Sequence, residues 1–208
     1  MASNKSRGNP ARGALEPRRR PGKERVAALL EAAASVIAER GFEAATMAEV
    51  ASRAGALVGS LYHFFPNKEV LGDALVERYG RIIDGAFAEI DRRSASMPIE
   101  AFADALLDLL VEIQGETRAL LALLEARAEL SARRGEFREA ALGHIARTLM
   151  LRSPRLRPEA ARPMAVVLLY NMKAMKALAA DDPTAVGASA ELRDMTRLYL
   201  ASKLADPA

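Results

Sequence analysis

Hydrophobic positions recur with a helical period along most of the chain. Between Lys23 and Gly41 the apolar residues fall on one helix face, and Gly41 is a typical helix stop. Beyond Arg93 the same character returns in segments at about 98–114, 117–131, 135–151, 158–180 and 188–204. These segments are separated by Pro98, Gly115, Arg133-Arg134-Gly135, Ser153-Pro154 and Asp182-Pro183. No segment keeps a period of two, so the sequence predicts an all-α protein of about nine helices.

Two short elements replace the long helices between residues 46 and 65. Thr46 and Glu49 have the spacing of a capping box, in which side chain and backbone of the two residues bond reciprocally. The helix that they begin is expected to end near Gly55. Pro66 disfavours helical geometry at the residue before it, and Asn67 can cap the next helix. The outline is a short helix, a glycine turn and a second short helix.

The second short helix has more apolar and aromatic residues than one buried face can hold. Leu61 and Phe65, four residues apart, are expected to anchor it to the core. Five other positions then lie on exposed or grazing faces: Val58, Gly59, Ser60, Tyr62 and His63. A pair of this kind can place its second helix in the DNA major groove.

The residues of this region also match a known family. The segment GFEAATMAEVASRAGALVGSLYHFFPNKEVLGDAL, residues 41–75, closely resembles the DNA-binding domain of TetR-type (TetR/AcrR) transcriptional regulators. The family pattern is an AG turn, a G-[AS]-LY-x-[HYF]-F core and a following [PS]-x-K-E, and the resemblance covers residues 23–75. It implies a three-helix helix-turn-helix domain at 22–68 and a helical effector-binding and dimerisation domain at 69–208, while the polar, proline-containing and basic composition of residues 1–21 predicts a disordered arm.

The resemblance also implies roles for individual residues. Thr46, Tyr62 and Lys68 match positions that hold backbone phosphate, and a lysine in the first turn of a helix opposes the dipole unless an anion docks there. Base edges are approached by Val58, Gly59, Ser60 and His63. Alternatives stay open: Tyr62 as a packing residue, His63 as an exposed residue without base contact, and Arg53 as either a phosphate ligand or a solvated charge.

One departure from the family concerns the start of the second helix. Leu57 stands where the family usually has a small polar residue, and leucine cannot cap a helix, which typically costs about 1 kcal/mol. The next residue, Val58, is also apolar where polar or basic residues are common. We therefore expect sequence discrimination to depend on His63, Ser60, methyl contacts, DNA shape and dimer spacing.

Positive charge is concentrated at the N-terminus. The first 25 residues hold eight basic and two acidic side chains, while the net charge of the chain is only +3. Arg18, Arg19 and Arg20 directly precede the first helix. They are expected to contact DNA phosphates or a minor groove, which would make affinity strongly salt-dependent.

The C-terminal region is expected to bind a second copy of the chain and a small molecule. Two half-sites imply a dimer, and the resemblance implies an interface on the last two helices, with Val167, Tyr170, Ala174, Leu178, Met195 and Tyr199. Effectors of the family bind in this domain. The candidate lining residues are Leu106, Leu110, Leu121, Glu125, His144, Leu168, Asn171, Met172 and Met175. Methionine at helical spacing is also compatible with ordinary core packing.

Composition argues against other classes of protein. The chain has no cysteine, two histidines and no glycine-rich phosphate loop, so no catalytic residue, metal site or cofactor is expected. No apolar run approaches the roughly 20 residues of a membrane span, and no export signal is recognisable. The expected protein is a cytoplasmic, nucleoid-associated regulator, most simply a repressor released from a palindromic operator by an apolar or amphipathic effector. The alternative is a DNA-binding scaffold or nucleoid protein controlled by a protein partner.

Overall fold

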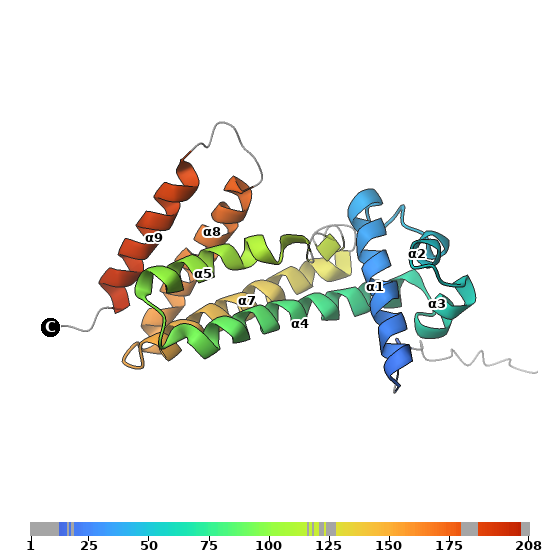
Figure 1. Cartoon of the computed structure of the whole chain (residues 1–208), viewed down its shortest axis with the longest axis horizontal. Helices are drawn as coiled ribbons and strands as arrows, with labels where there is room; N and C mark the ends of the chain where they lie inside the picture. Colours follow the sequence, from blue (N-terminus) through green and yellow to red (C-terminus); the bar gives the residue numbers. More distant parts are fainter. Residues whose placement is uncertain are drawn as a thin grey trace, which may run out of the picture. The chain divides into compact units, whose positions relative to one another are not determined.

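The computed structural model describes residues 13–15, 17, 19–115, 117, 119–120, 123, 128–179 and 187–204. Its elements are all helices, which confirms the predicted all-α class (Figure 1). They are α1 (Arg20–Arg40), α2 (Met47–Arg53), α3 (Val58–Phe64), α4 (Lys68–Ser94), α5 (Ile99–Glu112), α7 (Ala128–Arg152), α8 (Pro158–Leu178) and α9 (Ala188–Leu204). The described residues form two compact units, one up to Glu77 and the other from Arg78 onward.

The first unit is built on the apolar face of α1. That face packs against α2, which in turn packs against α3. Gly41 ends α1 at a positive φ of 79°, a conformation that glycine adopts without a steric penalty. Its amide donates to the carbonyl of Ile37 at 2.8 Å. The core of this unit contains Leu29, Ala33, Val36, Ile37, Phe42, Val50, Ala51, Leu61, Phe65, Leu71 and Leu75, each at most 4% exposed.

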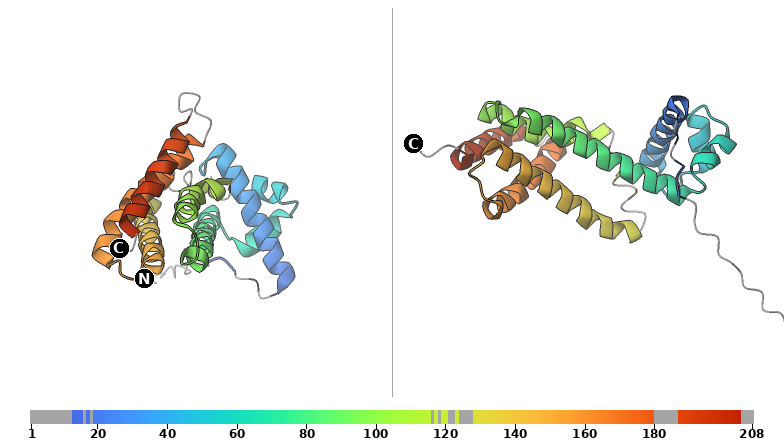
Figure 2. Two further views of the ribbon diagram at one scale, coloured as in Figure 1. Left: turned by 60° about the vertical axis from the view of Figure 1, so that its left-hand side comes forward. Right: turned by 90° about the horizontal axis from the view of Figure 1, so that it is seen from below.

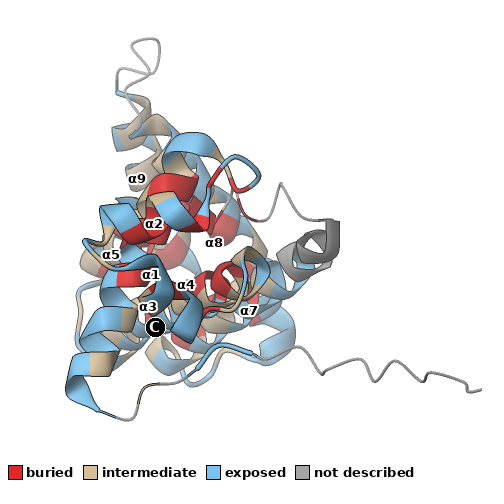
Figure 3. Ribbon diagram, turned by 90° about the vertical axis from the view of Figure 1, so that its right-hand side faces the viewer, coloured by how far each residue is buried: buried red, intermediate tan, exposed pale blue. Residues whose placement is uncertain are grey.

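The second unit is a bundle in which α8 packs against α5, α7 and α9, and α5 packs against α9 (Figure 2). One apolar cluster joins its helices, with Phe87, Phe102, Leu106, Ile145, Leu149, Leu168, Met172 and Leu200 among its members. Buried residues lie on the facing sides of the helices and exposed residues on their outer sides (Figure 3). The predicted face of α8 with Met164, Leu168, Met172 and Met175 is fully part of this interior.

Two helix boundaries differ from the predictions. Helix α1 begins at Arg20 rather than Lys23, because Pro21 is tolerated in a first turn and Arg20 pairs with Glu24 at 2.9 Å one turn later. The predicted break at Arg133-Arg134-Gly135 is wrong, since α7 runs without interruption from Ala128 to Arg152. A single glycine costs a helix only about 1 kcal/mol, and the 25-residue helix absorbs it.

The long helices are not of a membrane-spanning kind. Among the described residues, no helix combines the length and the apolar character that crossing a membrane requires.

Candidate DNA-binding surface

Helix α2 begins with the predicted capping box. The Glu49 amide donates to the Thr46 hydroxyl at 3.2 Å, and the Thr46 amide and hydroxyl donate to the Glu49 carboxylate at 3.2 and 2.9 Å. The Thr46 bonds hold the pKa of Glu49 below its usual value. Thr46 itself is exposed, and its backbone is extended just before the helix. The box fixes where the helix-turn-helix begins.

Helix α3, which follows the glycine turn, has one side that is anchored in the core and one side that is open to solvent. Gly55 has a positive φ of 60°, and the chain re-enters a helix at Val58 without any side-chain cap from Leu57, as predicted. Leu61 and Phe65 are buried, at 0% and 1% exposure. On the open side Tyr62 is 49% exposed and Val58 42%, and Gly59 and His63 are also exposed, while Ser60 is half-buried.

Part of the N-terminal arm lies along the same helix end. The Leu15 amide donates to the Phe64 carbonyl at 3.0 Å. A groove of about 620 Å³ is lined by Gly13 and Leu15 of the arm together with Tyr62, His63 and Pro66. The arm is thus held beside two of the residues proposed to read DNA. The sequence does not predict this contact, because a backbone bond leaves no side-chain signature.

Besides Thr46, two more of the predicted phosphate ligands already have protein partners. The Arg53 guanidinium donates to both oxygens of the Glu39 carboxylate and to the Ser35 hydroxyl, the latter at 2.8 Å. These bonds raise the pKa of Arg53 and lower that of Glu39. The pair links α2 to α1 and neutralises the arginine charge, so the structure gives Arg53 a packing role of its own.

Lys68 is held in a similar way. Its Nζ donates to the backbone carbonyls of Phe42 and Glu43 at 3.0 and 2.9 Å and lies 4.8 Å from the centre of the Phe42 ring. Two carbonyl acceptors account for a lysine in the first turn of α4 without any phosphate. Asn67 caps the same turn, accepting from the Val70 amide at 2.8 Å as predicted.

The three arginines before the first helix have different positions. Arg18 lies outside the described residues, Arg19 is exposed directly before α1, and Arg20 belongs to α1 and pairs with Glu24. Arg19 and Arg20 both lie at the start of α1.

The residues proposed for an effector pocket are mostly packed together in the second unit. Leu106, Leu168 and Met172 belong to its apolar cluster, Leu110 packs against that cluster, and Met175 is 3% exposed. Leu121 and Glu125 lie outside the described residues. The structure gives no further indication that this set surrounds a ligand.

The two polar members of that set that the structure describes, His144 and Asn171, have partners. His144 Nε2 lies 2.9 Å from the Asp84 carboxylate, and the His144 ring stacks on Phe87 with centroids 4.9 Å apart. Asn171 Nδ2 donates to the Thr196 hydroxyl at 3.1 Å and so links α8 to α9. These contacts explain polar groups on otherwise apolar helices.

Most of the proposed dimer residues lie on the outer side of α8 and α9, whereas Tyr199 packs against the apolar cluster of the unit. Tyr170 is 58% exposed, Met195 54% and Val167 43%. Ala174 is exposed, and Leu178 and Tyr199 are half-buried. Burial raises the pKa of the Tyr199 hydroxyl. Leu198, which was not predicted, is the most exposed large apolar residue of the two helices at 72%.

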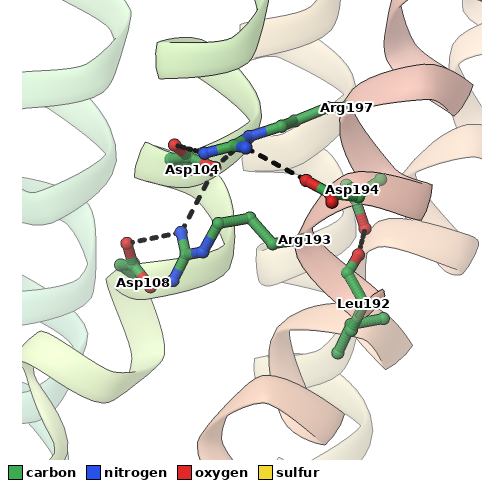
Figure 4. A network of polar contacts seen from close by, with 7 residues as sticks. Asp104, Asp108, Leu192, Arg193, Asp194 and Arg197 are labelled. Atoms are coloured by element: carbon green, nitrogen blue, oxygen red, sulfur yellow. Dashed lines mark hydrogen bonds and ion pairs between the residues drawn. The ribbon is translucent and has the colours of Figure 1, made fainter. Parts of the chain in front are cut away.

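An ion-pair ladder joins α5 to α9 (Figure 4). Arg193 donates to both oxygens of Asp108 at 2.9 and 2.7 Å and approaches Asp104 at 3.2 Å. Arg197 donates to both oxygens of Asp104 at 2.9 and 2.6 Å. The signal was present in the sequence, since the two aspartates and the two arginines each stand four residues apart and so share a helix face. No cluster of side chains suited to a metal ion occurs in the part of the chain that the structure describes.

Comparison with known proteins agrees with this geometry. Residues 29–75 match the family model described as bacterial regulatory proteins, tetR family. The HTH-type transcriptional repressor KstR2 of Mycobacterium tuberculosis (strain CDC 1551 / Oshkosh) is 42% identical over 72 residues, which cover 31% of this chain and 36% of that protein. KstR2 of Rhodococcus jostii (strain RHA1) is 42% identical over 62 residues, 30% of each chain. The chain thus aligns with only about a third of the length of these relatives.

Solved structures resemble the chain over more of its length. A transcriptional regulator of the TetR/AcrR family from Aquifex aeolicus VF5 superposes with a TM-score of 0.63 at 18% identity, covering 86% of this chain and 99% of that one. A TetR-like transcriptional regulator from Rhodococcus sp. RHA1 gives a TM-score of 0.58 at 18% identity, covering 93% and 100%. At these identities the likeness concerns the fold. Together, the helix-turn-helix geometry, the match of residues 29–75 to the tetR family model and the shared fold make the chain similar to TetR-type regulators.

Proposed function

We propose that the chain is a DNA-binding transcriptional repressor that binds a palindromic operator as a homodimer and is released by a small apolar or amphipathic effector. The observation that carries the proposal is the division of α3. Leu61 and Phe65 are buried, while Val58, Tyr62 and His63 face outward from the same two turns. A short helix anchored on one side and open on the other suits insertion into a major groove.

The open residues suit different parts of DNA. Tyr62 offers a hydroxyl to phosphate, His63 and Ser60 can bond base edges, and Val58 can meet a thymine methyl. A Cβ at Gly59 would meet no protein atom within 4 Å, so packing within the protein does not require glycine there. The missing side chain would instead allow the backbone of α3 to approach DNA closely. The relatives that match this region are named as repressors, which supports repression as the direction of control.

Dimerisation is supported by the outer side of α8 and α9. Four large apolar side chains there are more than 40% exposed, Val167, Tyr170, Met195 and Leu198, on two helices that pack against each other. Exposed apolar residues gathered in this way are typical of protein interfaces. A second copy of the same chain is the occupant that a palindromic operator requires.

The alternative is a DNA-binding scaffold or nucleoid protein controlled by a protein partner. It shares the same α3 surface but needs neither an operator sequence nor a small molecule. Sequence preference therefore separates the two functions, since a scaffold bound chiefly to phosphate has little of it.

Selection of bound duplexes from a random DNA pool tests the proposal. We expect enrichment of an inverted repeat, bound by two chains in sedimentation experiments. The full chain with Val58→Asp, which places a negative charge on the open side of α3, is the control and should enrich nothing. Binding that is uniform over all sequences would favour the scaffold, and enrichment of a single half-site would contradict the dimer.

A further inference from the structure

A second cavity lies at one end of the helical bundle, apart from the residues predicted to hold an effector. It has a volume of about 560 Å³, within the usual range for small-molecule sites. Its lining comes from the start of α5, the connection between α7 and α8, and the end of α9: Ile99, Arg152, Ser153, Pro154, Arg155, Ala201 and Leu204.

The polar side of this cavity is positive. Arg152 and Arg155 line it together with the Ser153 hydroxyl, and none of the described lining residues is acidic. Arg152 Nη1 is occupied by the carbonyl of Ala95 at 3.0 Å. Its Nε is buried and has no hydrogen-bond acceptor among the described residues. A buried N–H of a charged group without an acceptor is costly, so the described protein contacts leave the Arg152 guanidinium only partly satisfied.

Helix α5 adds to the positive character. Its N-cap residue is Pro98, which supplies no side-chain hydrogen bond to the first amides. Those amides carry the positive end of the helix dipole and are suited to an anion. The C-terminal ends of α7 and α9 also border the cavity and carry the opposite dipole, so the two arginine charges decide the sign of the site.

The other side of the cavity is apolar. Ile99 and Leu204 are half-buried and pack against the main apolar cluster of the unit, and Ala201 also lines the cavity. Such a lining matches a molecule with one anionic end and one apolar end. We propose that this cavity binds a small amphipathic carboxylate, with Arg152, Arg155 and Ser153 holding the carboxylate and Ile99, Ala201 and Leu204 the apolar end.

This assignment gives the effector of the proposed function a chemical class and a place, and in that respect it rests on the proposed function. The ligand would contact α9, which also presents Met195 and Leu198 on its outer side. Binding at the cavity is measured without DNA and DNA binding without ligand, so failure of either proposal is distinguishable from failure of the other.

Calorimetric titration of the full-length protein with octanoate tests the site. Octanamide has the same size without the charge, and inorganic phosphate has charge without an apolar end. We expect octanoate to bind at least tenfold more tightly than either. Arg155→Gln and Ser153→Ala should each weaken octanoate binding at least fivefold, whereas Arg157→Gln, an exposed arginine nearby that does not line the cavity, should leave it unchanged.

Several results would overturn the proposal. They are no octanoate binding at millimolar concentration, equal binding of octanamide, equal binding of phosphate, or equal losses in all three variants. Circular dichroism identifies a variant that fails to fold. Because Arg155 is on the surface and Ser153→Ala removes a single oxygen atom, at least one of the two lining variants is expected to keep the fold.

Discussion

The backbone amide of Leu15 donates to the backbone carbonyl of Phe64 at 3.0 Å. This bond joins the N-terminal arm to the C-terminal end of α3, the helix that exposes Tyr62 and His63. Phe64 is the last residue of α3, so its carbonyl has no partner within the helix and is open to a donor from another segment. The arm is therefore fixed at one point beside the candidate DNA-binding surface.

Removing this single donor is expected to weaken DNA binding. Leu15→Pro deletes the N–H, while Leu15→Ala keeps it and shortens only a half-exposed side chain. We expect Leu15→Pro to lose about 1 kcal/mol of binding free energy, roughly fivefold in Kd, because the basic arm is no longer held in place. Fluorescence anisotropy at several salt concentrations should also show a shallower salt dependence. Equal affinities and equal salt dependences of binding for the two variants would show that the bond does not position the arm.

His63 and Tyr62 are expected to differ in what their loss does to specificity. Tyr62→Phe removes a phosphate-bonding hydroxyl and should weaken binding to all sequences about equally. His63→Ala removes a base-facing group and should also change which operators are preferred, by about 1–3 kcal/mol at the affected position. Selection of bound duplexes from a random DNA pool with each variant measures its operator preference. The same operator ranking for wild type and His63→Ala would eliminate base reading by His63.

Lys68 is expected to contribute to stability as well as to DNA binding. In Lys68→Met the carbonyls of Phe42 and Glu43 lose their common donor, which should lower the free energy of unfolding by about 1 kcal/mol. Lys203→Met, at an exposed position in the last turn of α9, is the control and should unfold like the wild type. Urea unfolding provides the measurement. Weakened DNA binding with unchanged stability would instead assign Lys68 to phosphate alone.

The ladder between α5 and α9 predicts a dependence of stability on pH. Hydrogen bonds from Arg197 and Arg193 hold the pKa of Asp104 below its usual value. The folded state therefore favours the carboxylate, and this contribution is present above the unfolded pKa of about 3.9 and is lost as the pH falls through the folded pKa. Asp104→Asn should cost about 1–2 kcal/mol at pH 7 and progressively less below pH 4.

A neighbouring aspartate provides the control for this prediction. Asp194 is 68% exposed and makes one bond with Arg197, at 3.1 Å. Asp194→Asn should change the melting temperature little at any pH, because an exposed ion pair of this kind contributes at most about 1 kcal/mol. If the difference in stability between the wild type and Asp104→Asn did not shrink at low pH, ionisation of Asp104 would not be its cause.

Local signals in the sequence were enough to predict the geometry of the helix-turn-helix. The Thr46–Glu49 spacing fixes the start of α2, and the Leu61–Phe65 spacing fixes which side of α3 is buried, because both depend on neighbours within one turn. Long-range partners were not predictable in this way. Arg53 pairs with Glu39, fourteen residues away, and the Asp108–Arg193 pair spans 85, so their formation depends on how whole helices pack.

The outer side of α8 and α9 supports the last prediction. Tyr170 and Leu198 are 58% and 72% exposed, on two helices that are in contact, and a second copy of the chain would remove both from water. Tyr170→Glu or Leu198→Glu would place a charge in that interface without disturbing the monomer core, so sedimentation should show a shift from dimer to monomer. Leu151→Glu, at a 44% exposed leucine on α7, should remain dimeric. Because operator binding needs two half-sites, the two interface variants should also lose most operator affinity while keeping their thermal stability as monomers. A dimer that persists in both would move the interface away from α8 and α9.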